Sequence, residues 1–288
     1  MAGIDDSPDN SLPRRTVTAA DVPTALAMRL ARLALSGFAR LFSVLVLLGS
    51  WELLARAGTF THFQLPAFSD VVVHIWQDGV SGDLWLNTGL TLYRALVAFC
   101  IAGVGGVAIG IAMSRSRIAA WFFDPIISVG FPMPKIAFLP VIILWLGVHD
   151  VSKITMAYFD AIFPVIAATV IAIQGVEREL IWSARNMGAS NREVLTQVVL
   201  PAAFPQIMTG LQVALPLALI VTVVAEMLMG GYGLGGAMME ASRFANSTGV
   251  FAGIVEITVV GYLLVKAMAL IRRRLLIWHP EAHEPSTV

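Results

Sequence analysis

Uninterrupted apolar stretches dominate this sequence, and each is long enough, at about twenty residues, to cross a lipid bilayer as a helix. Of the 288 residues, 57% are hydrophobic and only 13% are charged. Backbone polar groups find no water in hydrocarbon, so only helices and closed barrels span a membrane. Helix-length apolar stretches therefore predict an all-α, polytopic membrane protein.

We expect about six spans, within a membrane domain covering 33–274 and flanked by polar tails at 1–32 and 275–288. Pro132, Pro134 and Lys135 interrupt the third span, which is either one broken span or a short helix, a break and a span from about Ile136. The expected spans are Leu33–Leu54, Leu90–Met113, Phe122–Leu146, Ile154–Ile173, Ile207–Met229 and Val250–Ile271.

Positive charge is distributed unequally between the two sets of loops. One side would hold only Arg56, Lys153 and Arg243, whereas the other holds both arginine-bearing tails and the 175–206 loop. Lysine and arginine are retained in the cytoplasm. Both termini and the 175–206 loop are therefore predicted to be cytoplasmic. The arginines on that side are Arg14, Arg15, Arg29, Arg32, Arg115, Arg117, Arg178, Arg185, Arg192, Arg272, Arg273 and Arg274.

Several function classes find no support in the sequence. A single cysteine, Cys100, excludes an internal disulfide and a multi-cysteine metal site, and zero formal net charge points to no nucleic-acid partner. No lysine follows a glycine in a phosphate-binding loop, and no hydrolase or metalloprotease motif occurs. We expect no catalysis, metal or cofactor in this chain.

Ionisable residues within the spans are candidates for a translocation path, because each is costly in hydrocarbon and seldom faces lipid. Arg94, Lys135 and Glu226 are the main candidates. Apolar residues surround Glu226 on both sides, so its carboxylate is expected to face the bundle interior. Two interpretations remain open: a carboxylate pairs internally with Arg94 or Lys135, or these groups contact a transported solute.

Small residues recur every four positions in the second span, at Ala102, Gly106 and Gly110. Such spacing lets a neighbouring helix approach closely. Packing within one bundle and a contact between subunits both remain open.

The 175–206 loop is far longer than a simple connection between spans requires. Residues 177–187 have helix-forming composition, with Leu180, Ala184 and Met187 along one apolar ridge. Gly188 predicts a helix stop, Ser190–Glu193 predicts a capping box, and a second helix is expected to end at Pro201. The ridge suits either a groove on a partner protein or the membrane surface.

This loop resembles the cytoplasmic signature of permeases from binding-protein-dependent ABC importers. The signature reads Glu-Ala-Ala, three residues, Gly, nine residues, Ile, one residue and Leu-Pro. It corresponds here to Trp182-Ser183-Ala184, Gly188, Val198 and Leu200-Pro201, with Trp182 in place of the usual glutamate. Ala225-Glu226 followed by Gly233-Leu234-Gly235 is similar to the sulfonate, taurine and nitrate subfamily.

The resemblance implies an importer in the bacterial inner membrane that works by alternating access. Its permeases form a homodimer, dock two ATP-binding subunits that hold ATP and Mg, and receive substrate from an extracytoplasmic solute-binding protein. Trp182, Ser183, Ala184, Gly188, Leu200 and Pro201 would couple this chain to the ATPase. The substrate would be a sulfonate, taurine or nitrate-like anion. An aromatic carboxylate, a pyrimidine-type solute and ATP-independent secondary transport are the alternatives.

Overall fold

The computed structural model describes residues 42–278, which belong to two compact units divided between Thr59 and Phe60. In the first unit, residues 42–56 are helical and cover part of the predicted span Leu33–Leu54. The start of that span, the predicted tail 1–32 and residues 279–288 lie outside the described residues.

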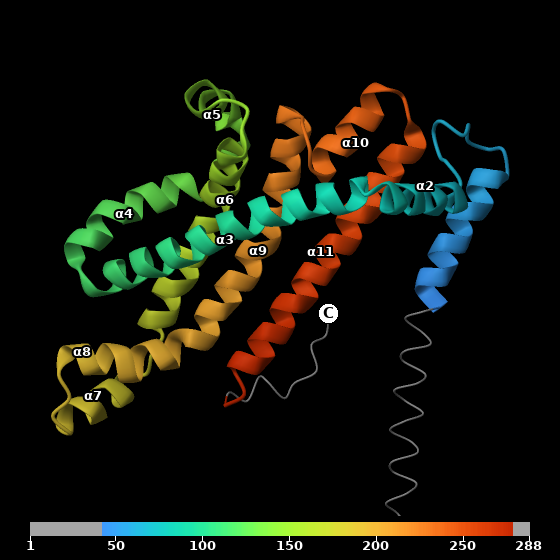
Figure 1. Ribbon diagram of the computed structural model, residues 1–288. Coiled ribbons are helices and arrows are strands. Elements are labelled where there is room, and N and C mark those ends of the chain that lie inside the picture. Colours follow the sequence, from blue (N-terminus) through green and yellow to red (C-terminus); the bar gives the residue numbers. More distant parts are fainter. Residues whose placement is uncertain (1–41, 279–288) are drawn as a thin grey trace, which may run out of the picture. The chain divides into compact units, whose positions relative to one another are not determined.

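The second unit is built of helices, and its part up to residue 278 contains no strand. Figure 1 shows α3, α6 and α9 crossing its centre, with α7 and α8 at one end and α5 and α10 at the other. In chain order the elements are α2 (Phe68–Ser81), α3 (Asp83–Arg115), α4 (Arg117–Gly130), the 3-10 turn η1 (Lys135–Phe138), α5 (Leu139–Leu146), α6 (Asp150–Gln174), α7 (Arg178–Asn186), α8 (Asn191–Glu193), the π-helical turn η2 (Val194–Val199), α9 (Leu200–Met229), α10 (Leu234–Arg243) and α11 (Ser247–Leu275).

Four helical stretches of the described chain are long and apolar enough to span a membrane, and they contain α3, α6, α9 and α11. A fifth candidate is the pair formed by α4 and the η1–α5 segment, which is bent by 94°. Pro132 and Pro134 lie in this bend, where each removes a backbone donor. The structure therefore shows the predicted break within the third span, and the two halves are long enough to be a span only when taken together.

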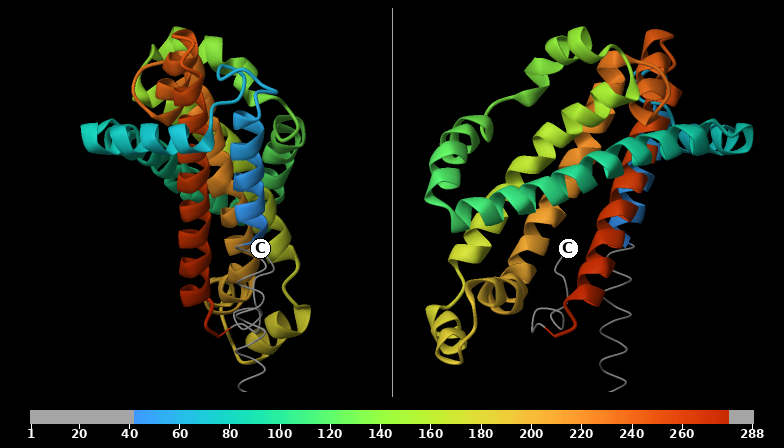
Figure 2. Two further views of the ribbon diagram at one scale, coloured as in Figure 1. Left: turned by 90° about the vertical axis from the view of Figure 1, so that its right-hand side faces the viewer. Right: turned by 60° about the vertical axis from the view of Figure 1, so that its left-hand side comes forward.

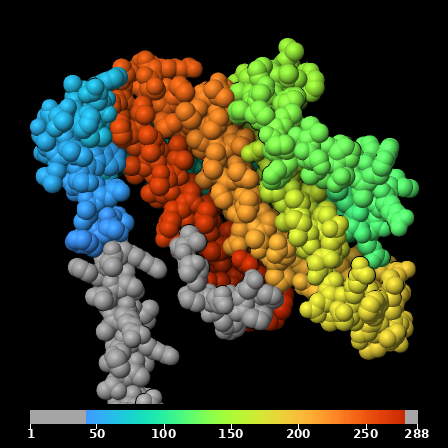
Figure 3. Space-filling view, turned by 180° about the vertical axis from the view of Figure 1, so that it is seen from behind, coloured from blue at the N-terminus to red at the C-terminus, as the bar shows by residue number. Residues whose placement is uncertain are grey.

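The small-residue face of α3 packs against α6 of the same chain. A Cβ atom added to Gly106 would lie 2.8 Å from the Val165 side chain, and one added to Gly110 would lie 2.6 Å from Thr169. Packing within one bundle is thus confirmed for this face. From behind, α9 is seen between α6 and α11 (Figure 3).

The predicted break at Pro201 is wrong. Asn191–Glu193, Val194–Val199 and Leu200–Met229 follow one another as one continuous helical segment, which Figure 2 shows entering the bundle. In its π-helical turn, the Leu200 amide donates to the Leu195 carbonyl, five residues back. Pro201 has no amide hydrogen to continue this pattern, so the wider turn accommodates its ring without ending the helix.

Candidate functional site

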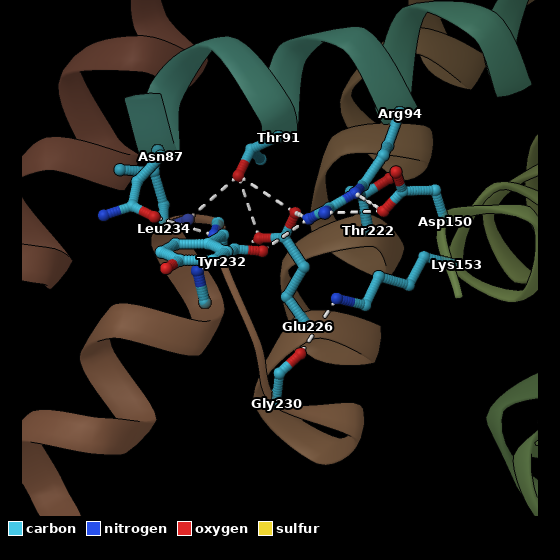
Figure 4. A network of polar contacts seen from close by, with 12 residues as sticks. Asn87, Thr91, Arg94, Asp150, Lys153, Thr222, Glu226, Gly230, Tyr232 and Leu234 are labelled. Carbon is cyan, nitrogen blue, oxygen red and sulfur yellow. Dashed lines mark hydrogen bonds and ion pairs between the residues drawn. The ribbon is translucent and has the colours of Figure 1, made fainter. Parts of the chain in front are cut away.

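A buried carboxylate, Glu226 near the end of α9, is the centre of a polar network that Figure 4 shows. Its side chain is 0% exposed and accepts a hydrogen bond from Thr91 Oγ1, at 2.8 Å from Oε2. Arg94 Nη1 lies 2.5 Å from Oε1, and the Gly235 amide lies 3.1 Å from Oε2. A buried charge persists only where such partners replace water, so the site is built around Glu226.

Arg94 connects three segments through one guanidinium group. Besides Glu226, it contacts Asp150 at the start of α6, with Nε at 2.9 Å and Nη2 at 2.7 Å from Oδ1. Its Nη1 also donates to the Tyr232 carbonyl, at 2.7 Å. The planar fork of arginine suits such multiple contacts, and they tie α3, α6 and the 230–233 loop together.

The 230–233 loop joins α9 to α10 and has an unusual backbone. Gly230, Gly231 and Gly233 have φ angles of +72°, +82° and +129°, which side chains rarely adopt. The Gly233 amide donates to Asn87 Oδ1 and the Leu234 amide to Thr91 Oγ1, at 2.8 and 2.9 Å. A Cβ atom on Gly233 would collide with the Glu226 carboxylate. Glycine is therefore required where the loop passes the buried charge.

Lys153, one turn into α6, holds the same loop from the other side. Lys153 is only 4% exposed, and its Nζ donates a hydrogen bond to the Gly230 carbonyl at 2.9 Å. Two buried cations, Arg94 and Lys153, thus bind backbone carbonyls of a single glycine-rich loop (Figure 4).

Lys135 lies apart from this network. Its Nζ pairs with Asp160 at 3.0 Å and lies 4.9 Å from the centre of the Phe163 ring. Lys135 lines an apolar cavity of about 450 Å³ between α4, α5 and α6. The predicted internal pairing is therefore found for Arg94 with Glu226, and Lys135 has a different carboxylate partner. Contact of the three with a solute stays a prediction.

At the opposite end of α9, helix α7 divides its apolar residues between two faces. Ala184 is 6% exposed and belongs to a cluster with Val176, Val194 and Val199. Trp182 is 56% and Met187 79% exposed. Of the predicted ridge, Ala184 is therefore covered by its own chain, whereas Leu180 and Met187 stay exposed.

The remaining predicted coupling residues surround the turn after α7. Ser183 and Pro201 are exposed, and Leu200 is half-buried at the start of α9. Gly188 has a φ of +88°, which confirms the predicted helix stop. These positions are compatible with docking, and their role in coupling stays a prediction.

The capping box after this turn is present as predicted. Glu193 Oε2 accepts a hydrogen bond from the Ser190 amide at 2.7 Å, and Ser190 Oγ accepts one from the Glu193 amide. Hydrogen bonding by the Ser190 side chain and backbone holds the pKa of Glu193 below its usual value. The box fixes the direction in which the chain enters α9.

Sequence reasoning missed four members of the network: Asn87, Thr91, Asp150 and Lys153. All lie near the ends of spans, where polar residues are common and carry little signal. The glycine-rich stretch after Glu226 was the available clue. No cluster of three metal-ligating side chains occurs within residues 42–278.

Comparison with known proteins places these features in context. The family model described as "Binding-protein-dependent transport system inner membrane component" matches residues 104–277. The taurine transport system permease protein TauC of Escherichia coli is 32% identical over 82% of this chain and 88% of its own length. The putative aliphatic sulfonates transport permease protein SsuC of Bacillus subtilis is also 32% identical, over 81% of this chain and 84% of its own.

The fold is similar to that of a solved transporter. The inward-facing methionine ABC transporter MetNI superimposes with a TM-score of 0.55 and 20% identity. The match covers 67% of this chain and 94% of that one. At this identity the likeness concerns the fold.

Proposed function

This chain belongs to the family of binding-protein-dependent transport system inner membrane components, and we propose that its importer carries a small sulfonate-type anion. It is a multi-pass permease subunit of an ABC transporter in the inner membrane. The relatives named for taurine and aliphatic sulfonates support this substrate class.

One observation carries the proposed mechanism: a continuous helical segment connects the exposed loop to the buried charge. It begins at Asn191, directly after the turn that follows α7, and reaches Glu226 without a break. Ala184 of α7 packs on the first turns of this segment through Val194 and Val199. We expect a displacement of α7 to be transmitted along this continuous segment to the Arg94–Glu226 network, as alternating access requires.

The exposed face of α7 is the proposed docking site for a separate ATP-binding subunit, which holds ATP and Mg. Trp182 is exposed on the side of α7 opposite Ala184, and Arg178 and Arg185 lie on the same short helix. An amphipathic helix of this kind suits insertion into a groove of a partner. Trp182 would fill that groove by apolar contact where the family usually has a glutamate.

The complete transporter would contain two copies of this chain, two ATP-binding subunits and an extracytoplasmic solute-binding protein. The loop end carries Arg115, Arg178, Arg185 and Arg192, which supports a cytoplasmic position for it and for both termini. The network around Glu226 would then lie toward the side that receives substrate.

Reconstitution tests this function directly. The chain, its ATP-binding subunit and its solute-binding protein are placed in proteoliposomes, and ATP hydrolysis is measured with taurine, ethanesulfonate, nitrate, benzoate and a pyrimidine. We expect stimulation by a sulfonate. Stimulation by benzoate or the pyrimidine alone would contradict the substrate class, and uptake without ATP would contradict the ATP-driven mechanism.

A further inference from the structure

An open cavity of about 500 Å³ with a mixed polar and apolar lining lies at the network, at the start of α6. Cavities of this size commonly hold small ligands. Backbone of the 230–233 loop forms one wall, and the first residues of α6 form the other. The polar lining includes Arg94, His149, Asp150, Lys153, Gly230 and Tyr232.

The ammonium of Lys153 makes a single hydrogen bond at the wall of this cavity. A lysine has three N–H donors. Among the described residues, its one hydrogen bond is to the Gly230 carbonyl. The other two donors are therefore available to a ligand in the cavity that Lys153 lines.

The neighbouring carboxylates are already engaged with Arg94. Asp150 accepts two contacts from its guanidinium, and Glu226 is enclosed by Arg94, Thr91 and Gly235. Neither carboxylate forms an ion pair with Lys153, whose hydrogen bond is to a neutral carbonyl.

The backbone adds a second source of positive potential. Helix α6 is 25 residues long and starts at this cavity without a side-chain cap on its N-terminus. Unpaired amides and the helix dipole favour an anion at such an end. The Lys153 ammonium, with two donors left for a ligand, and a helix start without a side-chain cap thus meet at one cavity, and Arg94 holds the carboxylate of Asp150, the acidic residue of that first turn.

We propose that this cavity binds one small oxyanion, held by Lys153 and the start of α6, as a subsite on the substrate's route. The inference rests on the proposed function, whose sulfonate class supplies the anion. An anion on the two remaining donors of Lys153 would share this ammonium with the Gly230 carbonyl, so its arrival would couple the anion to the glycine-rich loop. The left-handed glycines allow that loop to respond.

Charge-selective labelling tests the subsite without transport. Val151 lines the cavity and is exposed, so Val151→Cys in a Cys100→Ala background offers one thiol there. In the assembled complex, we compare labelling rates for 2-sulfonatoethyl and 2-(trimethylammonium)ethyl methanethiosulfonate. Removing one positive charge should lower the anion-to-cation rate ratio about fivefold in Lys153→Gln.

Two matched variants distinguish loss of the positive charge at position 153 from a general change in structure. Lys153→Arg keeps the charge and should keep the ratio, and Lys266→Gln removes an exposed lysine of α11 and should also keep it. An unchanged ratio in Lys153→Gln would overturn the subsite. A fall in all three variants would assign the effect to a structural change and would also overturn it.

Transport measurements distinguish failure of the subsite from failure of the proposed function. In proteoliposomes, Lys153→Gln should raise the KM for taurine or ethanesulfonate uptake, while Lys266→Gln leaves it unchanged. If the wild-type complex is stimulated by a sulfonate and Lys153→Gln has the wild-type KM, the subsite is wrong and the function stands. If no sulfonate stimulates the wild-type complex, the proposed substrate class is wrong.

Discussion

Arg94 Nη1 lies 2.5 Å from Glu226 Oε1, and the two residues, 132 positions apart in sequence, are 3% and 0% exposed. This pair joins α3 to the far end of α9. Its remaining hydrogen-bonding capacity is used by Asp150, Thr91 and the 232–235 backbone. The pair therefore links the helix that continues from the exposed loop to the rest of the bundle.

Breaking this pair should destabilise the permease strongly. Removing one partner of a buried ion pair leaves an uncompensated charge and costs about 3–5 kcal/mol. We expect Arg94→Gln and Glu226→Gln each to lower the thermal unfolding midpoint of the purified chain. In the double variant the midpoint should fall by less than the sum of the two single decreases. Lys135→Gln, combined with Glu226→Gln, serves as the control and should be additive. Additivity in the Arg94–Glu226 cycle would contradict the coupling.

Gly233 should tolerate substitution far less than Gly230. Both combine a positive φ with an extended ψ, a region almost restricted to glycine, where a side chain costs about 1–3 kcal/mol. Only Gly233→Ala also places a Cβ atom against the Glu226 carboxylate, because nothing lies within 4 Å of such an atom at Gly230. Membrane abundance and thermal stability should fall further for Gly233→Ala than for Gly230→Ala. Equal decreases in the two variants would show that the backbone conformation alone, and not the contact with Glu226, limits substitution.

Substitutions of Gly188 test whether the turn after α7 is needed for coupling to ATP hydrolysis. No atom lies within 4 Å of an added Cβ, so the constraint there is the φ of +88°. We expect Gly188→Val to remain in the membrane but to lose substrate-stimulated ATPase activity in the complex. Gly188→Asn, whose side chain tolerates this region, should retain most of it. Normal activity in the valine variant would argue against a coupling role for the turn.

The two faces of α7 predict opposite phenotypes. Trp182→Ala removes an exposed contact, so it should weaken copurification of the ATP-binding subunit while leaving the unfolding midpoint of the permease unchanged. Ala184→Leu overpacks the cluster with Val194 and should cost about 1–3 kcal/mol of stability. The assignment of faces fails if Trp182→Ala destabilises the isolated permease.

The capping box gives a pH-dependent prediction. The pKa of Glu193 is lowered from 4.5, so its contribution to stability is present above that pH and is lost as the pH falls through the folded value. Glu193→Gln preserves the capping geometry without the charge. The variant should unfold at a lower temperature than the wild type at pH 7, and the difference should narrow below pH 4.5. A constant difference would exclude a role for the charge.

Local chemistry explains which features could be predicted. The stop at Gly188 and the capping box depend on residues within one turn of each other, so the sequence predicts both correctly. The break at Pro201 was wrong because a π-helical turn upstream absorbs the proline. The sequence did not indicate that Ala184 of the α7 ridge is covered, because its burial depends on Val194 and Val199, which follow the turn and pack in the same cluster.

By itself, the sequence determined the all-α membrane fold, the third-span alternatives and the family, because apolar length and a contiguous motif are local properties. Tertiary structure decided which charges meet. Arg94 could pair with any carboxylate within reach, and only the packing of α3 against α6 and α9 brings Glu226 and Asp150 to it. The need for glycine at 233 follows from the same packing, since the obstructing atoms belong to a side chain of the preceding helix. Such contacts arise from how helices pack together, which the local pattern of the sequence does not encode.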